Sequence, residues 1–366
     1  FVHAVRARRA PMLSPTASGK SFIIYLLVRY YAKRTLIIVP TTSLVSQLAS
    51  DFADYGFASD RNVHRIFAGQ DKQTDKLITI STWQSIYKLP KEYFEQFDVV
   101  IGDEAHLFKA KSLISILSKL DSCKYRFGFT GTLDGTQTHK LVLEGLFGSV
   151  RKVTSTSDLI EQKHLADLKI KAIVLTYPDE IRKMIARSAD YQSEIDYIVS
   201  LSARNNFIKN LTLSLEGNTL LLFQYVEKHG KLLYDILKKD CETRKIFFVH
   251  GGIDGSEREN IRKIVEEEQN AIIVASYGTF STGVNIRNLH NVIFASPSKS
   301  KIRNLQSIGR GLRKSDSKDS ATLYDIADDM SWKSKKNFTL LHFMERIKIY
   351  NEEKFEYKIY TVSIKI

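Results

Sequence analysis

The sequence predicts an α/β protein with two tandem lobes, each a mainly parallel sheet flanked by helices. The chain has 366 residues, which exceeds one ordinary domain and fits two of about 150 to 200 residues. Short β-branched apolar runs alternate with longer segments of helical periodicity in both halves, as parallel strands joined by helices require. A Ser/Thr-rich, apolar-poor stretch at 149–158 separates the halves and is the expected linker.

The pattern assigns most elements by position. In the first half it predicts buried strands at 35–39, 77–80, 97–101 and 126–129, and helices at 43–55 and 112–120. In the second half it predicts strands at 219–224, 245–249, 271–275, 291–295 and 321–324, and helices at 191–215, 231–239, 256–268 and 304–312. The basic tail is expected to form a helix through Tyr350 and then a strand. The expected divisions are therefore a first lobe at 1–152, a second lobe at 153–332 and a short basic C-terminal extension at 333–366.

Composition excludes several classes of protein. Hydrophobic residues make up 43% of the chain, which rules out global disorder. Two cysteines, Cys123 and Cys241, cannot build a disulfide framework or a Cys-rich zinc site. No apolar run approaches the roughly 18 residues of a membrane span, and no apolar signal core follows Phe1, so we expect a cytoplasmic protein without a membrane partner. The formal net charge of +13 favours a polyanionic partner.

The first chemical signal is a loop before the helical run at 22–31. The segment SPTASGKS matches the phosphate-binding pattern G-x-x-x-x-G-K-[ST] except that Ser14 replaces the first glycine. Gly19 would let the backbone approach phosphate, Lys20 would reach the β- and γ-phosphates, and Ser21 would bind Mg²⁺. A Gly-Lys-Ser tripeptide alone is common, so its position before a helix matters. The expected nucleotide-binding residues are Ser14, Pro15, Thr16, Ala17, Ser18, Gly19, Lys20 and Ser21.

The second signal is a pair of acids at the end of an apolar strand. Asp103 would hold the metal and Glu104 would polarise the attacking water. The alternative is a solvated acidic turn, which the phosphate loop upstream makes less favourable.

The third signal is a polar face in the other half of the chain. On a helix, Gln306, Arg310 and Arg313 are spaced by four and three residues and share one face. Such a face suits a γ-phosphate sensor and arginine fingers, and the alternative is a basic surface helix. ATP is accordingly expected at a seam, with the cradle and carboxylates from one lobe and the guanidinium groups from the other.

The order of these and further motifs resembles the superfamily 2 helicases over nearly the whole chain. The segments are SPTASGKS, VPTTSLVSQ at 39–47, DEAH at 103–106, FTGT at 129–132, ASYGTFSTGVNI at 275–286 and QSIGRGLR at 306–313. Within that superfamily the chain is similar to the recombination DNA helicases of phages. The resemblance implies two RecA-like lobes, the first ATP-binding and the second a C-terminal helicase domain, with ATP and Mg²⁺ as cofactors.

The resemblance also implies roles for individual residues. The catalytic positions are Lys20, Asp103, Glu104, Gln306, Arg310 and Arg313, and Gly283 would also touch the nucleotide. Coupling between hydrolysis and nucleic acid is implied for His106, Thr130 and Thr132. Contacts to the nucleic-acid backbone are implied for Thr41, Ser81, Thr82, His250, Gly251 and Thr279.

The expected function is an ATP-dependent DNA helicase or translocase. Such proteins unwind or branch-migrate Holliday junctions, forks, D-loops and R-loops, so the expected partners are branched or single-stranded DNA, RNA–DNA hybrids and single-strand-binding or recombination proteins. The alternatives are an RNA helicase, the motor of a restriction or repair complex, and a non-catalytic nucleic-acid-binding scaffold. Only 13 residues precede Ser14, so an adenine-reading segment and a small N-terminal DNA-binding domain are expected to be missing.

Two basic clusters are further candidates for DNA contact. Residues 299–318 hold seven Lys or Arg against one acid, and residues 331–366 hold eight against four. A charge run is usually a solvated face, but beside helicase motifs it favours phosphate binding. Trp83 has two interpretations, a base-stacking residue and a core residue.

Overall fold

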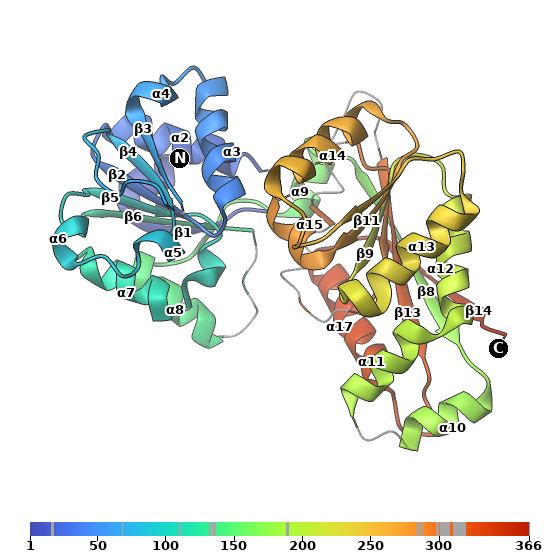
Figure 1. Cartoon of the computed structure of the whole chain (residues 1–366). Coiled ribbons are helices and arrows are strands. Elements are labelled where there is room, and N and C mark those ends of the chain that lie inside the picture. The colour runs from blue at the N-terminus through green and yellow to red at the C-terminus, as the bar shows by residue number, and fades with distance from the viewer. Residues whose placement is uncertain are drawn as a thin grey trace. The chain divides into compact units, whose positions relative to one another are not determined.

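A computed structural model describes most of the chain as two compact units, Phe1–Ser155 and Thr156–Ile366. The described residues are 1–15, 18–67, 69–109, 111–131, 133, 137–187, 190–283, 286, 288–297, 300, 308–309 and 320–365. Each unit contains a seven-stranded sheet in which the strand pairings are parallel. Helices cover both faces of each sheet (Figure 1). The α/β class and the two-lobe architecture predicted from the sequence are confirmed.

The first unit has the strand order β3-β4-β2-β5-β6-β1-β7. Its strands are β1 (Arg9–Leu13), β2 (Thr35–Val39), β3 (Val63–Ile66), β4 (Ile78–Thr82), β5 (Val99–Gly102), β6 (Tyr125–Thr130) and β7 (Arg151–Lys152). Its helices are α1 (Val2–Ala7), α2 (Lys20–Tyr31), α3 (Thr42–Asp54), α4 (Ser59–Asn62), α5 (Trp83–Ile86), α6 (Lys91–Phe94), the 3₁₀ helix η1 (Ala105–Lys109), α7 (Lys111–Lys119) and α8 (Gln137–Phe147).

Strand β2 shows why this sheet is covered on both faces. All five of its residues are buried, and successive side chains of a strand point to opposite faces. Ile37 and Val39 join an apolar cluster with α2 and α3, whereas Leu36 and Ile38 join a second cluster with α6 and α7. A continuous β-branched run is therefore the expected sequence of such a strand.

The second unit has the strand order β10-β11-β9-β12-β13-β8-β14. Its strands are β8 (Asp167–Thr176), β9 (Thr219–Phe223), β10 (Ile246–Val249), β11 (Ile272–Ser276), β12 (Asn291–Phe294), β13 (Ser320–Asp329) and β14 (Tyr357–Ser363). Its helices are α9 (Thr156–Glu161), α10 (Asp179–Arg187), α11 (Tyr191–Ser200), α12 (Ser202–Ser214), the π-helix η2 (Val226–Gly230), α13 (Lys231–Asp240), α14 (Gly255–Glu267), α15 (Tyr277–Gly283) and α17 (Phe338–Glu352).

The C-terminal segment is part of the second sheet. Strand β14 pairs with β8 along seven positions, and α17 packs on β13. Buried Arg346 of α17 donates from Nε to both carboxylate oxygens of Asp325 on β13, each at 2.9 Å. On the opposite face of the same strand, Asp328 accepts from buried Arg204 of α12 at 2.7 Å. Two charged clamps thus fix β13 between α12 and α17.

Helices of the described part of the chain are all too short or too polar to cross a membrane.

Candidate functional site

The predicted phosphate loop connects β1 to α2 at the carboxyl edge of the first sheet. Ser14 N–H donates to the carbonyl of Thr130 at 2.8 Å, so the loop leaves the sheet beside the end of β6. Gly19 has φ of 80°, a left-handed conformation that favours glycine, and a Cβ there would meet nothing within 4 Å. Glycine is therefore needed for backbone conformation and also leaves open space beside the loop. Thr16 and Ala17 lie outside the described residues.

Lys20 and Ser21 are the first two residues of α2. The Lys20 ammonium donates to the carbonyls of Ser14 at 3.2 Å and Pro15 at 3.3 Å, so it lies back across its own loop. The Ser21 hydroxyl is 3.0 Å from the hydroxyl of Tyr55, a residue that the sequence did not single out. Ser18 closes the loop by donating to the Pro15 carbonyl at 2.7 Å. The side chains expected to hold phosphate and metal are thus next to one another at the start of one helix.

The acidic turn follows β5 at the same edge. Asp103 N–H donates to the Ile38 carbonyl at 3.0 Å, and its carboxylate accepts from Glu104 N–H at 2.9 Å. Glu104 has a φ of 51°, which is uncommon for a residue with a side chain. Gly102 is also required, because a Cβ there would lie 2.6 Å from the Phe108 ring.

The carboxyl group of Asp103 has an unusual electrostatic environment. Desolvation and the neighbouring Glu104 carboxylate raise the pKa of Asp103 to about 6, while Lys20 and His106 oppose that increase. A carboxylate pair of this kind repels itself and is stabilised by a cation. The loop and the acidic turn also meet at Thr130, whose carbonyl accepts from Ser14 N–H and whose hydroxyl lies 2.9 Å from His106 Nδ1.

His106 connects the acidic turn to the end of β6. Its Nδ1 lies 2.9 Å from the Thr130 hydroxyl and 3.3 Å from the Glu104 carboxylate. His106 and Thr130 are both buried, so these contacts are shielded from water. The resemblance to the superfamily 2 helicases implies one coupling group for His106 and Thr130, and the structure brings the two side chains together. Thr132 lies outside the described residues.

The predicted nucleic-acid residues of the first unit also lie at the carboxyl edge. Thr41 is the N-cap of α3 and accepts from Leu44 N–H at 3.4 Å. Ser81 and Thr82 end β4, and both side chains are buried. Parallel strands place these positions on the same edge as the phosphate loop, where open α/β sheets bind ligands. Trp83 is partly buried against the apolar cluster of α6 and α7, which favours its interpretation as a packing residue.

The predicted residues of the second unit follow β10 and β11. His250 Nδ1 accepts from Gly252 N–H at 3.1 Å, and its ring lies 4.9 Å from that of Phe248. A Cβ on Gly251 would lie 4.0 Å from the Thr279 hydroxyl, so these two predicted positions are neighbours. Gly283 is the last residue of α15. Gln306, Arg310 and Arg313 lie outside the described residues.

A buried polar network in this unit had no signal in the sequence. The carbonyl of Ser296, just after β12, accepts from the Tyr277 hydroxyl at 3.1 Å. The Ser296 hydroxyl lies 2.9 Å from Nδ1 of His229, whose Nε2 lies 3.2 Å from Asn205 Oδ1. Burial lowers the pKa of His229 to about 3, with Arg204 adding to the effect, so the imidazole is neutral near pH 7. These contacts fix α15, which carries Thr279, to the end of β12.

Comparisons with known proteins agree with this arrangement. Residues 4–135 match the family described as "Type III restriction enzyme, res subunit", and residues 202–315 match "Helicase conserved C-terminal domain". The chain is 39% identical over 378 aligned residues to the ATP-dependent DNA helicase UvsW of Enterobacteria phage T4, covering 98% of this chain and 74% of that one. It is 24% identical to the DNA 3′-5′ translocase XPB2 of Sulfurisphaera tokodaii, covering 85% of this chain and 76% of that one.

A solved structure extends the agreement in fold. The Type ISP restriction-modification enzyme LlaBIII bound to DNA matches with a TM-score of 0.69 at 18% identity, covering 99% of this chain and 30% of that one. That likeness concerns the fold alone, whereas the identity to UvsW covers almost the full chain. The chain therefore belongs to the superfamily 2 helicases, in the family of the phage T4 helicase UvsW.

Proposed function

We propose that this protein unwinds or branch-migrates recombination and fork intermediates, namely Holliday junctions, D-loops and R-loops. Its family makes it an enzyme, an ATP-dependent DNA helicase. The observation that carries the proposal for this chain is the grouping of Lys20, Asp103 and Glu104 at one sheet edge, where Thr130 contacts both the loop and the acidic turn. Phosphoryl transfer needs mainly charge neutralisation and positioning, and these three side chains supply both.

The nucleotide phosphates are proposed to bind at the start of α2. The backbone N–H groups and the dipole of a helix N-terminus favour anions there. Lys20 already lies across the loop and is bonded to two carbonyl oxygens, Ser14 and Pro15. It can exchange those neutral acceptors for charged phosphate oxygens, which form stronger hydrogen bonds with an ammonium.

The donor set at this edge also fits Mg²⁺. A divalent cation would offset both causes of the raised pKa of Asp103, its desolvation and the repulsion from Glu104. Ser21 and Asp103 are the residues that would hold it, and carboxylate and hydroxyl oxygens are suitable ligands. When bound, the ion neutralises charge on the phosphate oxygens.

Glu104 is proposed to orient the attacking water and accept its proton. His106 Nδ1 lies 3.3 Å from the Glu104 carboxylate and 2.9 Å from Thr130, so it holds the base in place and links it to the end of β6. We propose that His106, Thr130 and Thr132 couple this base to nucleic-acid contacts. The proposed contacts are Thr41, Ser81, Thr82, His250, Gly251 and Thr279. Gln306, Arg310 and Arg313 are proposed to sense the γ-phosphate and to stabilise transition-state charge.

A substrate panel tests the proposal. Phosphate release and strand separation would be measured with a four-way junction, a fork, single-stranded DNA, an RNA–DNA hybrid and RNA of equal length. We expect stimulation by DNA and separation of branched DNA, with Glu104→Gln as the inactive control. Stronger stimulation by RNA would identify an RNA helicase instead, and absence of phosphate release with every nucleic acid would indicate a binding scaffold.

A further inference from the structure

We propose that the basic turn, residues 332–336, is a second DNA-binding surface that contacts phosphates of a DNA arm. This inference rests on the proposed function and adds a contact to it. The segment joins β13 to α17 and contains Trp332, Lys333, Lys335 and Lys336. It is separate from the helicase motifs in sequence.

Strand lengths place the basic turn beyond the carboxyl edge of the second sheet. Strand β12 ends at Phe294, which pairs with Asp325, whereas β13 continues in register with β8 to Asp329. The last four residues of β13 therefore extend beyond β12. Because the strands are parallel, they extend past the edge where β10 and β11 end and where His250 and Thr279 lie. The basic turn follows this extension and so lies on the side of the sheet where nucleic acid is proposed to bind.

The basic turn has a defined conformation. Trp332 and Lys335 form two backbone hydrogen bonds with each other, at 3.0 and 3.1 Å. Lys335 Nζ donates to the Ala186 carbonyl of α10 at 2.6 Å, and Arg182 Nε of the same helix donates to the Ser331 carbonyl at 2.7 Å. Binding a ligand on such a turn would cost little conformational entropy.

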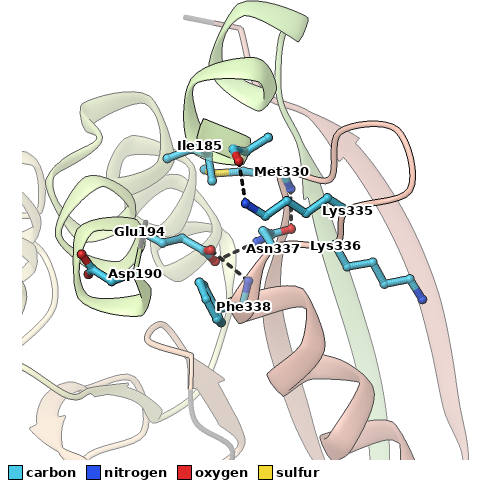
Figure 2. Close-up of a pocket in the computed structure, with 9 residues that line it drawn as sticks. Ile185, Asp190, Glu194, Met330, Lys335, Lys336, Asn337 and Phe338 are labelled. Atoms are coloured by element: carbon cyan, nitrogen blue, oxygen red, sulfur yellow. Dashed lines mark hydrogen bonds between the residues drawn. The ribbon is translucent and has the colours of Figure 1, made fainter. Parts of the chain in front are cut away.

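The buried Glu194 carboxylate beneath the basic turn is already occupied by the protein itself. A cavity of about 140 Å³ lies there, lined by Ile185, Met330 and Phe338 among others (Figure 2). The buried Glu194 carboxylate accepts from Asn337 Nδ2 at 2.9 Å and from Phe338 N–H at 2.9 Å at the start of α17. Figure 2 shows Lys336 extending away from this cavity. The Lys336 ammonium is therefore on the outer surface of the unit.

Exposed lysines gather on that outer surface. Lys183, Lys333, Lys335 and Lys336 are exposed, and none of the four forms an ion pair within the described ranges. Lys183 Nζ lies 4.8 Å from the centroid of the Trp332 ring, which gathers cationic and aromatic groups at one place. Lysines bind phosphate as point charges, so this group of cations matches the backbone of a DNA strand.

A matched pair of variants tests the surface. Lys333→Gln/Lys336→Gln removes two charges from the basic turn, and Lys231→Gln/Lys239→Gln removes two exposed charges from α13 of the same unit. The affinity of the full chain for a four-way DNA junction would be measured by fluorescence anisotropy over a series of KCl concentrations. The slope of log affinity against log salt is negative, and we expect the first variant to make it shallower by about 2. We also expect that variant to weaken binding roughly three- to tenfold. The α13 variant and the ATPase rate without DNA should match wild type.

The outcomes separate the two proposals. An unchanged slope in the basic-turn variant, or an equal fall in both variants, overturns this inference while junction-stimulated ATP hydrolysis of wild type still supports the proposed function. A wild-type chain that neither binds the junction nor responds to DNA overturns both. A slope that falls with an RNA duplex but not with the DNA junction also overturns the assignment to DNA.

Discussion

At the scale of single residues, Lys20 is the most direct test of the phosphate loop. Lys20→Ala should lower kcat/KM for ATP hydrolysis by about 100-fold or more, because it removes a preorganised cation from the phosphates. DNA binding without nucleotide should be retained. Lys33→Ala, an exposed lysine just after α2, is the control. Normal hydrolysis by Lys20→Ala in a phosphate-release assay would show that the nucleotide binds elsewhere.

Arg313 is predicted to act on the transition state rather than on binding. Arg313→Ala should reduce kcat by about 10³-fold or more, as loss of an arginine finger does, with a much smaller change in the Kd for ATP. Single-turnover phosphate release and titration with a fluorescent ATP analogue separate the two quantities. Equal losses in both would identify Arg313 as a group that binds ground-state nucleotide.

His229 should make the second unit sensitive to acid. Burial lowers its pKa from 6.5 to about 3, so below pH 6.5 the unfolded chain takes up a proton that the folded unit refuses. The contribution of neutral His229 to the free energy of unfolding is fully present above pH 6.5. It is lost as the pH falls toward 3, by up to about 1.4 kcal/mol per pH unit. The difference between the urea midpoints at pH 7.5 and pH 5 should therefore be smaller in His229→Gln than in His164→Gln, which changes an exposed histidine and serves as the control. Equal pH dependence in both variants would contradict this account.

At the scale of elements, the clamp between α17 and β13 should fix the C-terminal segment. Arg346→Ala leaves the Asp325 carboxylate buried without its guanidinium and should cost about 3 to 5 kcal/mol. Urea denaturation followed by circular dichroism measures the change. Lys348→Ala on the same helix removes only an exposed pair with Glu345, so its midpoint should not move. A stability for Arg346→Ala close to wild type would mean that α17 contributes little to this sheet.

Elements were predictable where one short-range pattern decides their structure. The buried runs at 35–39 and 219–224 are β2 and β9, because a strand covered on both faces needs continuous apolar residues. Strand β1 was missed because Arg9 and Pro11 are poor strand residues, although its neighbours pair it on both sides. The predicted helix at 191–215 is two helices, since Leu201 adopts an extended conformation between α11 and α12.

The site residues divide in the same way: those within a contiguous motif were predictable, and those that contact a distant segment were not. Lys20, Ser21, Asp103 and Glu104 were predictable because each lies in a contiguous motif whose spacing reflects one loop. The contacts from Tyr55 to Ser21 and from Tyr277 to the Ser296 carbonyl join segments 34 and 19 residues apart. The packing of α2 against α3 makes the first contact, and the alignment of β11 and β12 in the sheet makes the second. No local pattern in the sequence contains this packing or alignment.

At the scale of the whole molecule, each unit has the means to fold by itself. Among the described residues, every buried apolar cluster lies within one unit, as does each seven-stranded sheet. A fragment of residues 1–155 should therefore unfold cooperatively and bind an ATP analogue, because Lys20, Ser21 and Asp103 all belong to it. It should not hydrolyse ATP at the rate of the full chain, because Arg310 and Arg313 belong to the other unit.

Circular dichroism melts, titration with the analogue and phosphate release would measure these three properties of the fragment. Lys20→Ala in the fragment is the control for specific nucleotide binding. Binding with little hydrolysis, in a fragment that melts cooperatively, locates the phosphate cradle in the first unit and a necessary catalytic group in the second. Hydrolysis by the fragment at the full-chain rate would instead mean that Glu104 and Lys20 suffice, and that the proposed roles of Arg310 and Arg313 are wrong.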